Sequence, residues 1–393
     1  MDRKLTNIVT FRKCSQIANR IAVPPMLTYS GLNEGFVSED TINYYKARSN
    51  AAGMIIVEYI YVQRDGGPNI SLDYPEQLAL YSDGHMEGMQ KLVQGIQKDG
   101  NKAILQIQHG GRRAIGRYQK GEKVYAPSET DFSSIDYPVE VMTDEYIWEL
   151  IKNFGRATQL AIDIGADGVE IHGASHYLMQ QFFSQYSNRR NDFWGGSLEK
   201  RMNFPLETVK EITKVVKENK TKEFIVGYRI SPEEIHGENF GYDYKEAIKL
   251  AQALSQENID YIHLPPASGF KVSPDGEDAS YQELFREALN EEIILISNGG
   301  IQTEKQAQEA LKHADIIAIG RGTIIDPDFG LKIMEGRGDE IVSEISPAQL
   351  EKSQLTPGLV EIFSDSSNAF GIPMLSGYKS ITHLHKGWAR NSD

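Results

Sequence analysis

Cysteine is almost absent from this chain, with Cys14 the only one among 393 residues. A single cysteine excludes an intrachain disulfide, a cysteine-held iron–sulfur cluster and a four-cysteine zinc site. No run of roughly 18 apolar residues occurs, and the opening residues MDRKLTNIVTFRK lack the apolar core of a signal peptide. We therefore expect a cytoplasmic protein with no membrane partner.

Basic residues are also in the minority. Lys and Arg number 41 against 55 Asp and Glu, so the formal net charge is −14. This charge repels nucleic-acid phosphates, and we expect a small-molecule substrate and no nucleic-acid partner. The sequence contains neither GxGxxG nor GxxxxGK[ST], so the usual glycine-rich turns for dinucleotides and for nucleoside triphosphates are missing.

Short apolar runs alternate with longer amphipathic segments throughout residues 20–335. The runs are nearly continuous in hydrophobicity, which is typical of parallel strands buried on both faces. They lie at 21–25, 53–58, 102–108, 168–171, 224–229, 261–264, 293–297 and 316–320.

Helical periodicity fills the intervals between these runs. Met86, Met89, Val93 and Ile96 follow steps of three and four residues, and a second helical pattern begins after Thr143. Further helices are expected after Ser197 and Thr303. Eight strand-then-helix units predict an α/β fold, a (β/α)8 TIM barrel, with a doubly wound sheet as the alternative.

Two segments depart from the regular spacing. Residues 109–142 separate the third strand from its helix, far more than an ordinary βα loop, and we expect them to cover the active face. Residues 345–393 contain Pro347, Pro357 and Pro373 and form a C-terminal extension, either wrapped on the barrel or reaching a partner subunit. The expected organisation is a barrel over 1–344 and an extension over 345–393.

The carboxyl ends of barrel strands carry the chemistry of such folds. Glycine-rich turns follow the seventh and eighth runs, where barrels often bind phosphate through backbone N–H groups. Polar side chains also leave the third, fourth and fifth runs, at Gln106, His172 and Arg229. Together these residues favour a planar heterocycle attached to a phosphate, although each could also be a hydrogen-bonded core residue.

Residues 172–201, HGASHYLMQQFFSQYSNRRNDFWGGSLEKR, resemble the signature of the Old Yellow Enzyme family of FMN-dependent ene-reductases. The similarity extends to NRIAVPPM, GMIIVE, LQIQHGGR, the Arg229 strand and IAIGRGTIIDPDF, in consistent order over about 17–335. It implies a TIM barrel with noncovalent FMN, an NADH or NADPH reductant and a homo-oligomer.

The resemblance also implies a role for each matching residue. His172, Ser175, Tyr177 and Tyr29 correspond to substrate contacts, with Tyr177 as the acid that protonates the substrate Cα. The catalytic residues implied are Tyr177, His172, Ser175 and His176. The residues that correspond to FMN contacts are Pro24, Pro25, Met26, Leu27, Tyr59, Gln106, His172, Arg229, Gly299, Gly300, Gly320 and Arg321.

The implied reaction has two halves that share one pocket. NADH or NADPH reduces the flavin, and an α,β-unsaturated carbonyl compound then accepts hydride at Cβ. Donors after the fourth strand stabilise the charge that develops on the carbonyl oxygen. A shared pocket needs no separate dinucleotide-binding motif, which agrees with its absence.

Three positions depart from the family pattern. Ser175 stands where His or Asn is usual, and His176 where Gly is usual, so either could supply the second donor to the carbonyl. Leu27 stands where Thr or Cys commonly donates to the flavin, which predicts a flavin that is harder to reduce.

Several alternatives remain open at this stage. They are a catalytically impaired FMN-binding protein, a flavin-dependent amine N-demethylase and a flavin-free barrel lyase. A metal held by His172 and His176 is disfavoured, because Gly173 and Ala174 follow a strand exit and no third ligand is evident. No metal is therefore expected.

Overall fold

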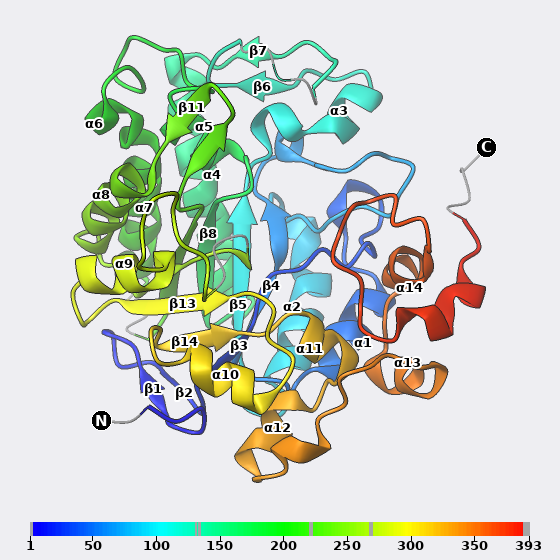
Figure 1. Cartoon of the computed structure of the whole chain (residues 1–393). Coiled ribbons are helices and arrows are strands. Elements are labelled where there is room, and N and C mark those ends of the chain that lie inside the picture. Colours follow the sequence, from blue (N-terminus) through cyan, green and yellow to red (C-terminus); the bar gives the residue numbers. More distant parts are fainter. Residues whose placement is uncertain (1–2, 130–131, 133–134, 220–222, 267–269, 388–393) are drawn as a thin grey trace.

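Eight parallel strands close into a barrel, and Figure 1 shows strands and helices of the chain in side view. This computed structural model describes residues 3–129, 132, 135–219, 223–266 and 270–387. Around the ring the strands follow chain order, and every neighbouring pair is parallel. They are β3 (Ile21–Val23), β4 (Met54–Tyr61), β5 (Lys102–Gln108), β8 (Gly168–Gly173), β9 (Ile225–Ile230), β12 (Tyr261–His263), β13 (Ile294–Asn298) and β14 (Ile316–Ala318).

The barrel expected from the sequence is confirmed, with one informative difference in the second strand. β4 continues to Tyr61, and its pairing with β5 shifts register between Val57 and Ile60. An irregularity of this kind re-aims side chains at the end of a strand. Glu58 and Tyr59 therefore lie within the irregular part of the strand rather than after it.

Helices surround the barrel because each has one apolar face that must be buried. Thr143 caps α4 as expected, its side chain accepting from the Tyr146 N–H. Ser197 caps only the short α6, and the longer helix predicted there is a separate one, α7. The principal helices are α1 (Glu39–Ala47), α2 (Met86–Gln97), α4 (Asp144–Asp163), α6 (Leu198–Arg201), α7 (Asn203–Glu218), α8 (Tyr244–Ser255), α9 (Tyr281–Ala288), α10 (Glu304–Ala310), α11 (Arg321–Ile325) and α12 (Phe329–Met334).

A short N-terminal hairpin closes the amino end of the barrel. Its strands are β1 (Val9–Thr10) and β2 (Gln16–Ile17), and Figure 1 places them at the end opposite β6 and β7. Phe11 packs on Tyr261 with 6.3 Å between ring centroids. The hairpin seals this end with apolar side chains and leaves the carboxyl end for the site.

Three additions cover the carboxyl end. The long segment after β5 contains α3 (Ile115–Gln119) and the paired strands β6 (Tyr125–Ala126) and β7 (Glu140–Val141). A hairpin of β10 (Glu234–His236) and β11 (Asn239–Tyr242) follows β9. Within the described ranges, no helix is both long and apolar enough to cross a membrane.

The third addition is the C-terminal segment, which packs beside α1 and α11 in Figure 1. It comprises α13 (Pro347–Ser353), α14 (Pro357–Ser364) and the 3-10 helix η7 (Tyr378–Leu384). The Thr356 hydroxyl donates to the carbonyl of Thr28, directly after the first barrel strand. The described part of the C-terminal segment therefore packs on its own barrel.

Candidate active site

A charged network fills the barrel interior below the mouth. Glu170 of β8 is fully buried, accepts from Gln106 Nε2 at 2.6 Å and pairs with His263 Nδ1 at 2.8 Å. Burial opposes ionisation of Glu170, but His263, Arg229 and the Gln106 amide together hold its pKa below the usual value. The Glu170 carboxylate therefore fixes the Gln106 amide, with its nitrogen turned toward the network.

Among the residues that the structure describes, two buried polar atoms near this network lack hydrogen-bond partners. They are Oε1 of Gln106, an acceptor, and Nε of Arg229, a donor. A buried polar atom without a partner costs about 1–3 kcal/mol, so such atoms are retained where a ligand completes them. One unpaired acceptor and one unpaired donor at the barrel mouth suit a planar heterocycle that carries both N–H and C=O groups, such as a flavin.

His172 and Tyr177 carry the side-chain groups of the site that can donate a hydrogen bond or a proton. The His172 ring lies 4.9 Å from the Tyr177 ring and 5.7 Å from that of Tyr59, centroid to centroid. Burial, with the positive charge of Arg229, His263 and Arg113, lowers the pKa of His172 well below its usual value. His172 is therefore a neutral imidazole at physiological pH, with one ring N–H to donate.

Arg113 is a residue that sequence reasoning did not single out. It is half-buried, and its guanidinium carbon lies 5.3 Å from the centre of the Tyr177 ring. Its Nη1 also donates to the carbonyl of Ser175 at 3.1 Å. In the sequence, only its place in the HGGRR stretch after β5 indicated a role for Arg113. Its contacts with Ser175 and Tyr177, in the loop after β8, depend on the tertiary fold.

A cavity of about 360 Å³ lies between the ends of the barrel strands and the C-terminal segment, and Arg229 and Tyr29 are among the residues that line it. Leu359 and Phe363 of α14, with Pro373, supply the wall that the barrel lacks. The cavity collects most of the predicted cofactor residues. Those lining it are Pro24, Pro25, Met26, Leu27, Arg229, Gly299, Gly300, Gly320 and Arg321, together with the predicted substrate contact Tyr29.

The sequence predicts a phosphate-binding site at the turns after β13 and β14, and the turn after β13 has a backbone conformation that favours glycine. Gly299 and Gly300 have φ of +127° and +69°, which side-chain-bearing residues rarely adopt. A Cβ on Gly320 would lie 3.1 Å from Met26 Sδ, so this strand end is also narrow. Arg321 projects from the start of α11, and its Nη1 donates to the Met374 carbonyl at 3.3 Å.

The segment that follows β3 is held by a buried carboxyl group. Glu58 accepts from the backbone N–H and the hydroxyl of Thr28. Burial raises the pKa of Glu58 to about 8, despite the two bonds from Thr28. Next along the chain, Tyr29 has a φ of +47° and packs on Phe370 at 5.9 Å. Glu58 thus shapes the turn that presents Tyr29.

Ser175 and His176 face different surroundings from His172. Ser175 is exposed, and its N–H donates to Ser231 Oγ at 3.3 Å. His176 turns toward the β10–β11 hairpin, where its ring lies 5.1 Å from that of His236. The two histidines of the motif therefore do not act as a pair.

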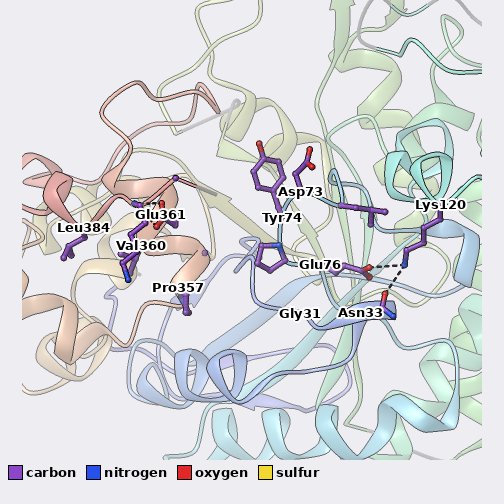
Figure 2. A pocket seen from close by; sticks show the side chains of 15 residues that line it. Gly31, Asn33, Asp73, Tyr74, Glu76, Lys120, Pro357, Val360, Glu361 and Leu384 are labelled. Carbon is purple, nitrogen blue, oxygen red and sulfur yellow. Dashed lines mark hydrogen bonds and ion pairs between the residues drawn. The ribbon is translucent and has the colours of Figure 1, made fainter. Parts of the chain in front are cut away.

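A larger hollow of about 840 Å³ lies outside this site, and Figure 2 shows it. Its walls come from the segments around Asn33 and Glu76 and from the C-terminal residues near Glu361. Lys120 crosses one wall, donating to Glu76 at 3.1 Å and to Asn33 at 3.2 Å. None of the predicted site residues lines this hollow, so the smaller cavity is the candidate active site.

Comparison with known proteins agrees with this geometry. The NADH:flavin oxidoreductase / NADH oxidase family matches residues 9–340. The chain is 36% identical over 349 residues to the probable NADH-dependent flavin oxidoreductase YqiG of Bacillus subtilis, covering 88% of this chain and 92% of that protein. It is also 37% identical over 369 residues to the NADH:acrylate oxidoreductase of Vibrio harveyi, covering 91% of this chain and only 36% of that protein.

Solved structures show the same fold at lower identity. Morphinone reductase in complex with tetrahydroNAD superposes with a TM-score of 0.71 at 23% identity, covering 90% of this chain and 97% of the other. The Old Yellow Enzyme homologue from Zymomonas mobilis gives a TM-score of 0.73 at 22% identity, with coverage of 90% and 99%.

The chain belongs to the NADH:flavin oxidoreductase / NADH oxidase family. The predicted resemblance to Old Yellow Enzyme is confirmed. The expectations of an oxidoreductase, of FMN and of a nicotinamide reductant are also confirmed at the level of the family.

Proposed function

We propose that this protein is an FMN-dependent ene-reductase that uses NADH or NADPH to reduce activated C=C bonds. The carrying observation is a neutral, buried His172 packed against Tyr177, together with the unpaired polar atoms of Gln106 and of Arg229, which lines the cavity. The packing of His172 on Tyr177 supports a site in which one residue donates a hydrogen bond to a substrate carbonyl and the other donates a proton, beside a bound heterocycle.

The residues present fit FMN. Gln106 Oε1 would accept from the ring, Arg229 Nε would donate to it, and the turns at Gly299–Gly300 and Gly320–Arg321 would take the phosphate. Tyr59 and the segment Pro24–Leu27 would complete the contacts. When bound, FMN supplies a two-electron carrier between the nicotinamide and the substrate.

The chain's own groups have distinct tasks in this proposal. The neutral imidazole of His172 donates a hydrogen bond to the substrate carbonyl, where negative charge develops as hydride reaches Cβ. The hydroxyl of Tyr177 gives its proton to Cα, completing addition of hydrogen across the double bond. The hydrophobic side chains of α14 exclude water from the cavity.

Arg113 bears on the class of substrate. A permanent cation close to the Tyr177 ring favours acceptors that carry a carboxylate. Relatives of this chain are named for acrylate and, in Klebsiella pneumoniae, for fumarate, which are both α,β-unsaturated acids. We include both acids among the proposed acceptors.

An anaerobic titration tests the proposal. The purified protein should show flavin absorbance, lose it on addition of NADH or NADPH, and recover it with cyclohexenone, acrylate, fumarate or a maleimide. Tyr177→Phe should slow recovery by about 10²–10⁴-fold and leave bleaching by the nicotinamide unchanged. Bleaching without recovery by any acceptor would identify a flavin-binding protein without ene-reductase activity.

A second titration identifies the other carbonyl donor. Phenols mimic the carbonyl oxygen of a bound substrate, so loss of a donor should weaken their binding. We compare Ser175→Ala, Arg113→Gln and wild type, each with FMN bound. Unchanged phenol affinity in the Ser175 variant would remove Ser175 from this role.

Assembly and location complete the proposal. The family resemblance supports a homo-oligomer, which light scattering of the purified holoenzyme measures. The near absence of cysteine agrees with a cytoplasmic location, which fractionation of the native host checks.

A further inference from the structure

Three side chains with metal-binding atoms meet beside the active site, outside the barrel mouth. His176 comes from the loop after β8, while Glu234 and His236 come from β10. Their candidate ligand atoms all lie within 4.8 Å of one another. His176 Nδ1 is 3.5 Å from Glu234 Oε2, and His236 Nε2 is 3.5 Å from Glu234 Oε1.

Both separations are longer than a good charge-assisted hydrogen bond, and the nearest side-chain partner of His176 Nδ1 is Gln180 Nε2 at 3.2 Å. A charge-assisted N–H···O bond has a length of about 2.7–2.9 Å, and 3.5 Å is beyond a good one. Zinc binds imidazole and carboxylate at about 2.0–2.2 Å in tetrahedral geometry, which places neighbouring ligand atoms about 3.3–3.5 Å apart. Each histidine lies at about that spacing from one oxygen of the Glu234 carboxylate, His176 from Oε2 and His236 from Oε1.

The Glu234 carboxylate is oriented by groups outside the cluster. It is fully buried and accepts from Gln180 Nε2 at 2.6 Å and from Ser184 Oγ at 2.9 Å. Gln180 Oε1 also accepts from the backbone N–H of His176 at 2.9 Å. Hydrogen bonds of this kind, which fix the ligands from behind, are a regular feature of metal sites.

The backbone conformation of Ser175 and His176 also favours a functional role for the cluster. Ser175 and His176 have φ of +59° and +61°, so two successive residues with side chains occupy the left-handed region. Non-glycine residues persist there where the surrounding structure requires it, often at functional positions. Here the conformation carries the His176 side chain toward Glu234 and His236.

We propose that His176, Glu234 and His236 bind a divalent transition metal, with Zn²⁺ as the best match to two imidazoles and one carboxylate. Both histidines also line a cavity of about 560 Å³, together with Arg112, Arg113 and Tyr186. Since Glu234 lies buried behind them, the remaining coordination position faces that cavity. The ion would tie the loop that carries Tyr177 to the β10–β11 hairpin.

Calorimetric titration of Zn²⁺ into the chelator-treated holoenzyme tests this site. We expect one saturable Zn²⁺ per chain. His236→Gln should weaken binding by at least about 10–100-fold, the loss that even changes outside the ligand shell produce. The His236 side chain is 38% exposed on a hairpin, so this variant should keep its flavin absorbance and far-UV spectrum.

A surface pair provides the matched control. His313 lies 3.4 Å from Glu283, and both side chains are 42% exposed, but no third ligand joins them in the described part of the chain. His313→Gln should leave Zn²⁺ binding unchanged, whereas Glu234→Gln should weaken it like the His236 variant. X-ray absorption at the zinc edge should show two imidazoles.

Three results would overturn the proposal. One is the absence of saturable binding to the wild type, and another is equal affinity in wild type and His236→Gln. The third is an equal loss in the His313 variant, which would assign the ion to scattered surface histidines. None of these measurements depends on ene-reductase activity.

Discussion

Glu58 allows a quantitative test of the region that shapes the active-site turn. Its carboxyl group is fully buried, and burial raises its pKa to about 8 from an ordinary value of 4.5. At pH 7 the folded protein therefore holds this group mainly as the neutral acid. Glu58→Gln replaces that acid with an uncharged group of the same shape, which can accept from the Thr28 N–H and donate to its hydroxyl.

The magnitude follows from the difference in proton affinity between the two states. The folded state binds the proton more tightly than the unfolded chain does. Wild-type stability attributable to Glu58 is therefore full below about pH 4.5 and falls as pH rises toward 8. Between pH 4.5 and 7 the loss is about 3 kcal/mol, at about 1.4 kcal/mol per pH unit. The glutamine variant escapes this loss.

Urea unfolding of wild type and Glu58→Gln at several pH values between 5 and 8, with saturating FMN, measures the effect. The free energy of unfolding of the variant, relative to that of the wild type, should increase steadily as pH rises. Exposed Glu145→Gln controls for the general effect of removing one negative charge. A stability difference that stays constant over this range, or that moves in favour of the wild type, would refute the reasoning.

Three further predictions concern the cofactor. Leu27 has no donor to offer the flavin, so Leu27→Thr should raise the flavin midpoint potential, and an unchanged or lower potential would contradict this. Arg229→Met removes positive charge that favours reduced flavin and should lower the midpoint potential, while Arg229→Lys should restore part of it; equal potentials in all three proteins would argue against that role. Phe363→Asp puts a carboxylate into the cavity wall and should weaken FMN binding by at least about tenfold, or about 1.4 kcal/mol, in ultrafiltration assays, with Phe363→Leu near wild type.

Hydrophobic periodicity was sufficient to predict the barrel. Eight apolar runs at the spacing of strand–helix units leave few other topologies, and all eight strands form near the predicted positions. The hairpins β1–β2 and β10–β11 were not predicted, since their strands are two to four residues long and carry mixed polarity. Such short strands are stable only through packing on the barrel.

The site was predictable where its residues leave strands. Gln106, His172 and Arg229 are polar residues within or directly after apolar runs, and the fold places them on three adjacent strands, with Gln106 beside Glu170 and His172 beside Arg229. Glu170 was visible as a charge inside a buried strand, but its partner His263 lies 93 residues away. The walls contributed by α14, and the meeting of His176 with His236, depend on long-range docking that no local pattern encodes.

The position of the C-terminal segment has a consequence for the order of assembly. The bond from Thr356 to Thr28 spans 328 residues, and a Cβ on Gly358 would lie 2.2 Å from the Tyr29 carbonyl, so the two segments fit closely. These contacts form only after residues 356–358 have been synthesised, and those residues follow all eight barrel strands in the chain. During synthesis the eight strands leave the ribosome before the last wall of the cavity does. The barrel can therefore close first, and the candidate active-site cavity is completed only when α14 docks.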